Sequence, residues 1–210
     1  MTLAHAMTLR QARDHYLAEA GFSTDTYVED WVDIPFGPLP LRLPSTDARK
    51  RVLPVHDIHH ALTGYRSDLM GEAEIGAWEL GGGLGPHTVG YVLDLLTLSW
   101  SPLLGARRVF RAFVRGRHTK NYYRAALPLP QSLLDRDVDE VRRELGLDRE
   151  LPAAKASDVA AFIGWYLASL LMAVVGLAGL PVLVALGLWG RWQARRASTG
   201  ARPQAHASVV

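Results

Sequence analysis

Residues 54–80 read PVHDIHHALTGYRSDLMGEAEIGAWEL and predict two helices in succession, joined by a short turn. The first runs from about Pro54 to Thr63, because proline suits the first turn of a helix and Gly64 suits the position just past its end. The second runs from about Leu69 to Leu80 and ends before a run of three glycines. This pair indicates a mainly helical chain.

Helical patterns also flank this pair. Thr8 and Gln11 have the spacing of a capping box, and apolar residues then follow near one helical face until Gly21 stops the helix. Further helices are expected from Pro86, from Pro102 to about Tyr123, and from about Ser132 to Leu145.

Residues 33–47, DIPFGPLPLRLPSTD, contain four prolines and suit neither a regular helix nor a central strand. We expect an extended segment that lies over the domain surface. No stretch alternates apolar and polar residues as a half-buried strand does. The predicted fold class is all-α: a helical bundle-like domain over residues 1–150, followed by a C-terminal apolar helix.

Residues 159–190 carry no charged side chain. A helix from Val159 to Trp189 would be roughly 46 Å long, which exceeds the roughly 30 Å of hydrocarbon in a bilayer. We expect one transmembrane helix, tilted or kinked at Pro181, in preference to a re-entrant or interfacial segment or a buried core helix. Residues 151–158 would be a linker, and residues 191–210 a basic tail that is disordered from about Ser198.

Charge and composition narrow the partners. The net charge is +2, but residues 159–210 hold four arginines and no acid, a pattern typical of a membrane-proximal tail rather than of a nucleic-acid binder. The N-terminus lacks the apolar core of a signal peptide. The basic flank at 191–196 would stay cytoplasmic, which for a single span puts the N-terminal domain outside. Without a leader, we expect a membrane-associated protein whose main domain is cytoplasmic.

A candidate metal site lies in the helical pair. His56 and His60 are one helical turn apart and point the same way, Asp57 can join the same edge, and Glu72 can return from the next helix. With no cysteine in the chain, a metal must be held by nitrogen and oxygen ligands. These four residues suit a divalent metal, with Zn²⁺ favoured over iron or manganese. His59 faces away and is expected to pack or to orient a ligand.

Two other interpretations compete with a metal site. A His-Asp pair on a helix is often a simple surface pair. An HD-type phosphohydrolase would need a further histidine and aspartate, for which His5, His15 and Asp94 are available, although none lies in a second motif.

The segment HDIHHALTGYRSDLMGE, residues 56–72, resembles the signature of the coenzyme Q biosynthesis protein 4 family, in which HDxxH is followed by eleven residues and a glutamate. The setting HALTGY and the closing GE are part of the likeness. The stretches VFRAFVRGRHTKNYY (109–123) and SLLDRDVDEVRRELGL (132–147) are also similar to that family, so the resemblance covers about residues 8–148.

The resemblance implies a helical fold that binds zinc through the positions of His56, Asp57, His60 and Glu72. It also implies a role in ubiquinone biosynthesis, with a polyprenylated ring precursor whose carboxyl group is lost and replaced by hydroxyl. The enzyme would then be a zinc-dependent oxidative decarboxylase of a prenylated hydroxybenzoate. The family has also been viewed as a non-catalytic scaffold that organises other quinone-biosynthesis enzymes. Other copies of this chain, in a homo-oligomer, are among the partners we consider. The apolar C-terminal extension departs from the pattern and allows a branch acting on another prenylated quinone or isoprenoid lipid.

Three further features complete the sequence picture. Leu84 to Leu104 is almost wholly apolar and predicts a buried central helix, or a wall of a channel for a polyprenyl tail near Asp94.

Arg107, Arg111 and Arg115 would form a stripe on one helix face, which is either solvated or in contact with anionic lipid. Tyr65 and Arg66, in the turn between the ligand-bearing helices, are candidates for binding an acidic substrate, together with Asp94.

Overall fold

The computed structural model describes residues 7–36, 39–125 and 127–200. The chain divides into two compact units, which are described separately below. The larger comprises residues 1–28 and 46–177, and the smaller comprises residues 29–45 and 178–210.

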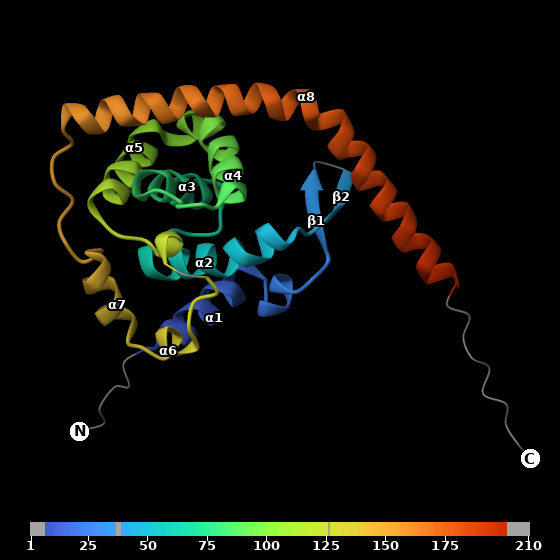
Figure 1. The fold of residues 1–210 in the computed structure, drawn as a ribbon, viewed down its shortest axis with the longest axis horizontal. Helices are drawn as coiled ribbons and strands as arrows, with labels where there is room; N and C mark the ends of the chain where they lie inside the picture. Colours follow the sequence, from blue (N-terminus) through green and yellow to red (C-terminus); the bar gives the residue numbers. More distant parts are fainter. Residues whose placement is uncertain (1–6, 37–38, 126, 201–210) are drawn as a thin grey trace, which may run out of the picture. The chain divides into compact units, whose positions relative to one another are not determined.

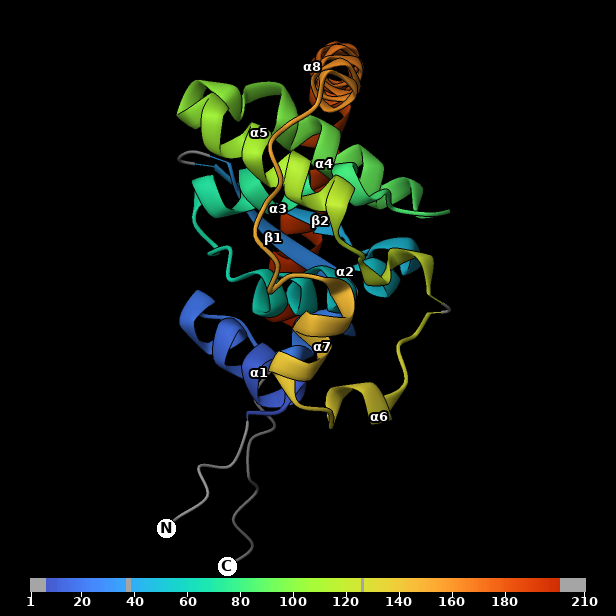
Figure 2. The same cartoon turned by 90° about the vertical axis from the view of Figure 1, so that its left-hand side faces the viewer.

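The larger unit is built from helices, as the sequence predicted. In chain order they are α1 (Leu9–Ala20), a short 3-10 helix η1 (Thr24–Tyr27), α2 (Asp47–Thr63), α3 (Leu69–Gly82), α4 (Thr88–Trp100), α5 (Pro102–His118), a second 3-10 helix η2 (Tyr122–Arg124), α6 (Gln131–Leu134), α7 (Val138–Leu145) and the first part of α8 (Ala156–Gly200). Figures 1 and 2 show that α3, α4 and α5 lie between α8 on one side and α2 on the other, with α1, α6 and α7 beyond α2.

Helix α1 begins and ends as its sequence predicted. The Thr8 side chain accepts a hydrogen bond from the Gln11 backbone while the Gln11 side chain accepts one from the Thr8 backbone, so the capping box is formed. Gly21 has a left-handed conformation with φ of 75° and closes the helix. Leu9 and Leu17 then face the core.

Helix α2 begins seven residues before the predicted start at Pro54. The Thr46 side chain caps it by accepting a hydrogen bond from the Arg49 backbone, and Pro54 lies inside the helix. The sequence prediction was wrong here because proline also fits a helix interior when the loss of one backbone bond is offset by packing. The additional turns place Val52 in the core. The predicted end at Gly64, with φ of 77°, is confirmed.

The core forms around α3, whose Trp78, Ile75 and Leu80 are almost wholly buried. Helices α3 and α5 approach unusually closely at two glycines. A methyl group on Gly116 would lie 2.0 Å from the carbonyl oxygen of Trp78, and one on Gly81 would lie 2.2 Å from that of Phe113. Only glycine permits this crossing, which fixes α3 and with it the ligand-bearing face toward α2.

Several predicted boundaries in the second half of the chain were wrong. Helix α5 ends at His118, not at Tyr123, and the following residues form η2. The single helix expected over 132–145 is two helices, because Asp137 begins a new helix by capping the Glu140 backbone. Helix α8 begins at Ala156, inside the expected linker, and continues through Pro181 to Gly200.

Helix α8 is long and apolar enough to cross a membrane, over Ala156–Arg196, and it is the one such helix in the described part of the chain. Its most apolar window is almost unburied. Residues 198–200, which were expected to be disordered, are helical, and the rest of the expected disordered tail, residues 201–210, lies outside the described residues.

The smaller unit contains a hairpin that the sequence did not predict. Strands β1 (Trp31–Phe36) and β2 (Leu39–Pro44) pair antiparallel, with Trp31 opposite Pro44 and Phe36 opposite Leu39. Proline is excluded from central strands, but a two-stranded sheet has only edges, so the prolines are tolerated. In this unit Leu41 covers Gly187 of α8, and the rings of Trp31 and Trp189 lie 6.5 Å apart.

Candidate metal centre

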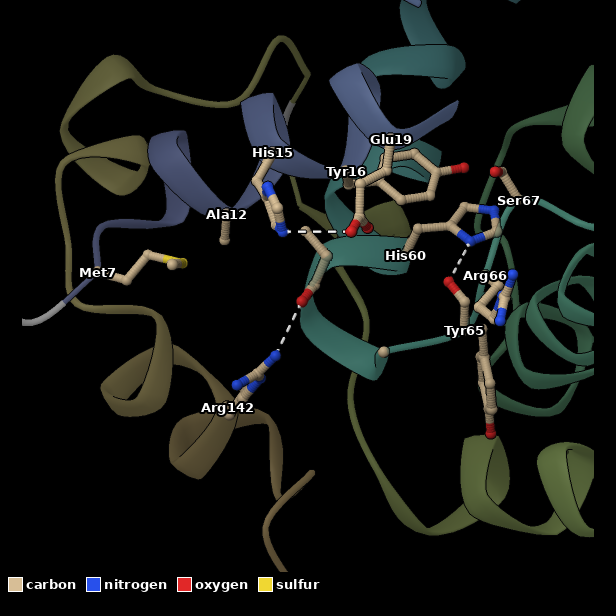
Figure 3. Close-up of a pocket in the computed structure, with 12 residues that line it drawn as sticks. Met7, Ala12, His15, Tyr16, Glu19, His60, Tyr65, Arg66, Ser67 and Arg142 are labelled. Carbon is tan, nitrogen blue, oxygen red and sulfur yellow. Dashed lines mark hydrogen bonds and ion pairs between the residues drawn. The ribbon is translucent and has the colours of Figure 1, made fainter. Parts of the chain in front are cut away.

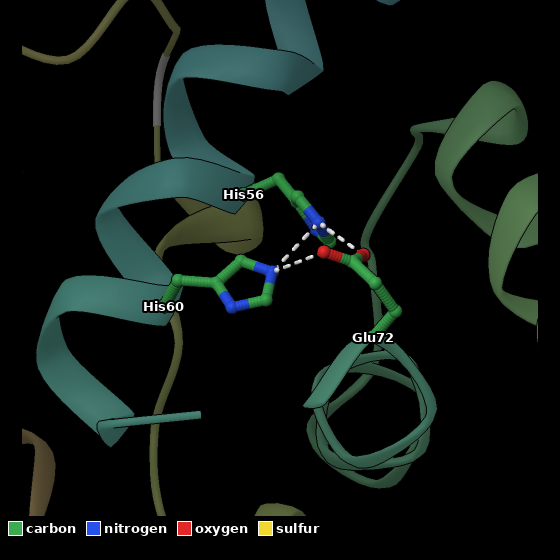
Figure 4. A group of neighbouring side chains, drawn as sticks. All are labelled: His56, His60 and Glu72. Carbon is green, nitrogen blue, oxygen red and sulfur yellow. Dashed lines mark hydrogen bonds and ion pairs between the residues drawn. The ribbon is translucent and has the colours of Figure 1, made fainter. Parts of the chain in front are cut away.

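The structure brings three of the four predicted ligands to one point. His56 and His60 project from α2 and Glu72 projects from the first turn of α3, as Figure 4 shows. The Nε2 atoms of the two histidines are 3.1 Å apart, and they lie 3.5 and 3.4 Å from the two Glu72 carboxylate oxygens. Tetrahedral zinc with bonds of about 2.0–2.1 Å keeps its ligand atoms roughly 3.3 Å apart, so these spacings fit such an ion.

Both histidine rings are held in the tautomer that a metal needs. The Nδ1–H group of His60 donates to the backbone carbonyl oxygen of Tyr65 at 2.9 Å. The Nδ1 atom of His56 lies 3.2 Å from both carboxylate oxygens of Glu79 and donates to them. Each Nε2 atom is then left with a lone pair, and the two lone pairs face each other. That arrangement is repulsive unless a proton or a cation lies between them, so the residues present fit a divalent ion.

Glu79 is the residue of this site that sequence reasoning missed. It lies two helical turns after Glu72 on α3 and is fully buried. Its carboxylate accepts from His56 and, at 2.7 Å, from Nδ1 of His59. A signal was present: an acid in the apolar run IGAWEL, seven residues after a ligand, lies on the same helical face and needs a buried partner.

His59 takes the supporting position expected for it. Its ring is fully buried, and its Nε2 atom accepts a hydrogen bond of 3.0 Å from the Tyr122 backbone N–H. The ring contacts Trp78 and Tyr123 edge-on. His59 therefore fixes Glu79, which in turn fixes His56.

Asp57 does not join the group formed by His56, His60 and Glu72. It follows His56 by one residue, so its side chain leaves the helix about 100° away from that of His56. Its buried carboxyl group lies beside the Tyr27 hydroxyl, although the two are not in hydrogen-bonding geometry. Burial raises the pKa of Asp57, and His56 lowers it by a smaller amount. Its role as a ligand stays a prediction.

The charges in the cluster shift the pKa values of His56 and Glu72 in opposite directions. Burial alone would lower the pKa of His56, but the Glu79 and Glu72 carboxylates outweigh it and hold the pKa well above the usual value. Burial likewise opposes ionisation of Glu72, but hydrogen bonds from His56 and His60 lower its pKa to about 2. The two carboxylates therefore favour positive charge at the position where the imidazoles meet.

Asp94 is buried but lies away from the cleft described below. It projects from α4 toward Gly76 and Glu79 of α3. Burial and the charge of Glu79 raise its pKa well above the usual range, so it is held as a neutral acid. The expectation that Asp94 contacts substrate receives no support from this position.

A cleft of about 680 Å³ opens beside the cluster, between α1, the end of α2 and the following turn. Figure 3 shows its lining, in which the Tyr16 ring stacks on His60 with ring centroids 4.6 Å apart. Tyr65 and Arg66, two of the predicted substrate-binding residues, are part of this lining. Arg66 is largely exposed and lies 3.2 Å from Asp68. His60 is the member of the cluster that lines this cleft, and Tyr16 covers its ring.

Among the described residues, those available to an HD-type phosphohydrolase lie apart from the cluster formed by His56, His60 and Glu72. His15 lies 3.4 Å from Glu19 in the cleft lining, Asp57 faces Tyr27, and Asp94 faces Glu79. His5 lies outside the described residues.

Comparison of the chain with protein family models, with characterised proteins and with solved structures finds no match. The motif of residues 56–72 and the geometry of the site are therefore the features from which function can be inferred.

Proposed function

We propose that this chain is a metal-binding protein of ubiquinone or related prenylquinone biosynthesis, membrane-associated, that acts on the ring of a polyprenylated precursor. The observation that carries the proposal is the convergence of His56, His60 and Glu72, with both imidazoles held in the ligating tautomer by groups outside the ligand set. The spacing of these residues also matches the family signature that the segment resembles.

The chain's own residues supply the positioning. Glu79 and the Tyr65 carbonyl orient the two imidazoles, and Tyr16 covers one face of His60. Glu72 remains 38% exposed, which leaves a path to the ligand atoms. A divalent ion held here would act as a Lewis acid on a ring oxygen of the substrate. Arg66 lies at the cleft entrance, where it can attract an acidic ring substituent.

The test is metal content and affinity of the purified chain. Glu72→Gln removes a ligand oxygen's charge and is expected to abolish stoichiometric zinc. Glu79→Gln keeps all three ligands but loses the anchor of His56, so affinity should fall about 10- to 100-fold in a chelator competition. Glu140→Gln, which removes an exposed carboxylate of α7, is the matched control and should bind as the wild type does.

Equal and substoichiometric metal in all three variants and in the wild type would refute the site. If zinc binds as expected, incubation with a prenylated hydroxybenzoate, dioxygen and zinc separates two roles. Conversion of the ring supports an enzyme. Bound precursor that is not converted supports the alternative proposal, a lipid-binding scaffold.

A further inference from the structure

The first half of α8, residues 156–177, has an inner face that packs on the larger unit. Its inward positions follow one another at alternating steps of four and three residues: Asp158, Phe162, Trp165, Ser169, Met172 and Gly176. This is the spacing of a helix that lies along a partner over its whole length.

Specific contacts bind this inner face to α4 and α5. Asp158 accepts a hydrogen bond of 2.6 Å from Nε of Arg117, and Phe162 meets Phe110 and Phe113 edge-on. Further along, Trp165 stacks on Tyr91 with centroids 5.7 Å apart. Figure 1 shows this part of α8 running lengthwise over the α3–α5 layer.

The outer face of the same helix is exposed and wholly apolar. Ile163, Leu167, Leu171 and Val174 are 52, 61, 67 and 63% exposed. Soluble monomers rarely leave so continuous an apolar surface uncovered, and such surfaces mark contact with a membrane or another protein. The face therefore needs a partner.

Packing of the inner face decides how α8 can meet a bilayer. An upright helix would draw α5 into the hydrocarbon with it, because Phe162 is held between Phe110 and Phe113. Helix α5 carries Arg107, Arg108, Arg111, Arg115 and Arg117. Each arginine at the bilayer centre shifts the insertion equilibrium by about a hundredfold in the unfavourable direction. A flat orientation avoids this cost and still buries the outer face.

The positive charge of α5 favours an anionic lipid surface over a second copy of the chain as the partner of this face. Arg107 and Arg111 lie beside Phe110 along a small cleft that ends at Ala154, next to the start of α8. Neither arginine has an ion pair with another described residue. No acidic residue occurs between Asp94 and Asp135.

We propose that residues 159–174 of α8 lie flat in the interface of an anionic bilayer. The outer face of the helix points toward the hydrocarbon, and Arg107 and Arg111 contact the lipid phosphates. This arrangement concerns only the larger unit and does not depend on the metal or on quinone chemistry. Apolar area supplies most of the binding, and the two arginines supply the preference for anionic lipid.

Depth measurements on the full chain test this orientation. The chain has no native cysteine, so single-cysteine variants at Val159, Leu167 and Val174 can carry a fluorescent probe without background. In vesicles of phosphatidylcholine and phosphatidylglycerol, spin-labelled lipids should quench all three probes at the same shallow depth. Ser169→Cys, on the fully buried inner position, is the control and should be shielded.

Two outcomes would overturn the proposal. A spanning helix would separate Val159 and Val174 by roughly 22 Å in depth, since fifteen residues rise about 1.5 Å each, with Val174 deepest because it lies midway between Val159 and Trp189. Absence of quenching at all three outer positions, with a dimer in solution, would assign the face to a second copy of the chain.

The arginines are tested by vesicle flotation. The double variant Arg107→Gln/Arg111→Gln should bind anionic vesicles about 30-fold more weakly while its weaker binding to pure phosphatidylcholine is unchanged. Arg143→Gln, in α7, is the matched control and should behave as the wild type. An equal loss on both vesicle types would overturn the phosphate contact.

Discussion

At the scale of residues, the site depends on a chain of contacts rather than on the ligands alone. The Tyr122 backbone fixes His59, His59 and His56 share the Glu79 carboxylate, and His56 then presents its Nε2 atom toward His60. Burial of a carboxylate is unfavourable unless its oxygens are satisfied, and here two imidazoles satisfy it. The same contacts that compensate the buried charge also orient the ligand.

The protonation of Glu72 predicts how stability depends on pH in the metal-free protein. Its pKa falls from 4.5 when unfolded to about 2 when folded. Its stabilising contribution is therefore complete above pH 4.5 and is lost as the pH falls toward 2. Because the side chain is 38% exposed, screening reduces the contribution to roughly 1 kcal/mol.

Wild type and Glu72→Gln should accordingly differ in free energy of unfolding at pH 6, with EDTA present, and the difference should shrink steadily below pH 4.5. Urea titrations at a series of pH values measure it. A difference that does not change with pH would contradict the ion pairs of Glu72 with His56 and His60.

At the scale of elements, local signals predicted the helices well and only some of their boundaries. The ends at Gly21 and Gly64 and the Thr8 capping box were predicted correctly because each depends on geometry and hydrogen bonds within a few residues. The start of α2 was misplaced because Pro54 was taken as a boundary, whereas core packing retains it inside. The hairpin was missed because its strands pair only with each other and need no alternation.

The residues of the candidate site could likewise be predicted only in part from the sequence. His56 and His60 could be predicted because helical spacing relates them directly, and Glu72 because the short turn between the two helices lets α3 return toward α2. Glu79, Tyr16 and the orientation of Asp57 could not, since they depend on how α1 and α3 pack against α2. That packing depends in part on small residues whose role is invisible in the sequence.

The close crossing of α3 and α5 yields a prediction at this scale. Gly116→Ala places a methyl group 2.0 Å from the Trp78 carbonyl oxygen, so the helices must separate. We expect a loss of about 2–4 kcal/mol in the free energy of unfolding, similar to other core overpacking and strain. Gly164→Ala is the matched control, because a methyl group there meets nothing within 4 Å. It should be neutral or slightly stabilising. Equal stability of the two variants in denaturant titrations would contradict the crossing.

At the scale of the whole molecule, α8 combines two roles that sequence reasoning treated as alternatives. Its length and composition satisfy the requirements of a membrane span, yet residues 156–177 also belong to the compact larger unit. Periodicity could not separate these roles because both faces of the helix are apolar. Only the three-dimensional contacts distinguish the side that packs from the side that is exposed.

Two neighbouring residues of α8 allow a test of whether its inner side is part of the core. Phe162 packs against Phe110 and Phe113, while Ile163, the next residue, is 52% exposed. A helix that served only as an anchor would tolerate alanine equally at both positions. If α8 is part of the core, Phe162→Ala should lower the free energy of unfolding by roughly 3 kcal/mol, the usual cost of removing a packed aromatic ring. Ile163→Ala should change it by less than about 1 kcal/mol.

The free energy of unfolding of both variants is measured by denaturing the full chain in a mild non-ionic detergent and following the near-ultraviolet circular dichroism of its aromatic side chains. Detergent covers the exposed face equally in the two cases, so the comparison isolates the inner contacts. A larger loss for Phe162→Ala would show that α8 contributes to the stability of the larger unit. In that case the apolar extension is a structural part of the domain. Removing it to improve solubility would destabilise α4, which carries Asp94, and α5, which carries Arg107 and Arg111. Equal effects would instead mean that α8 can leave the domain without cost and is free to insert as a separate element.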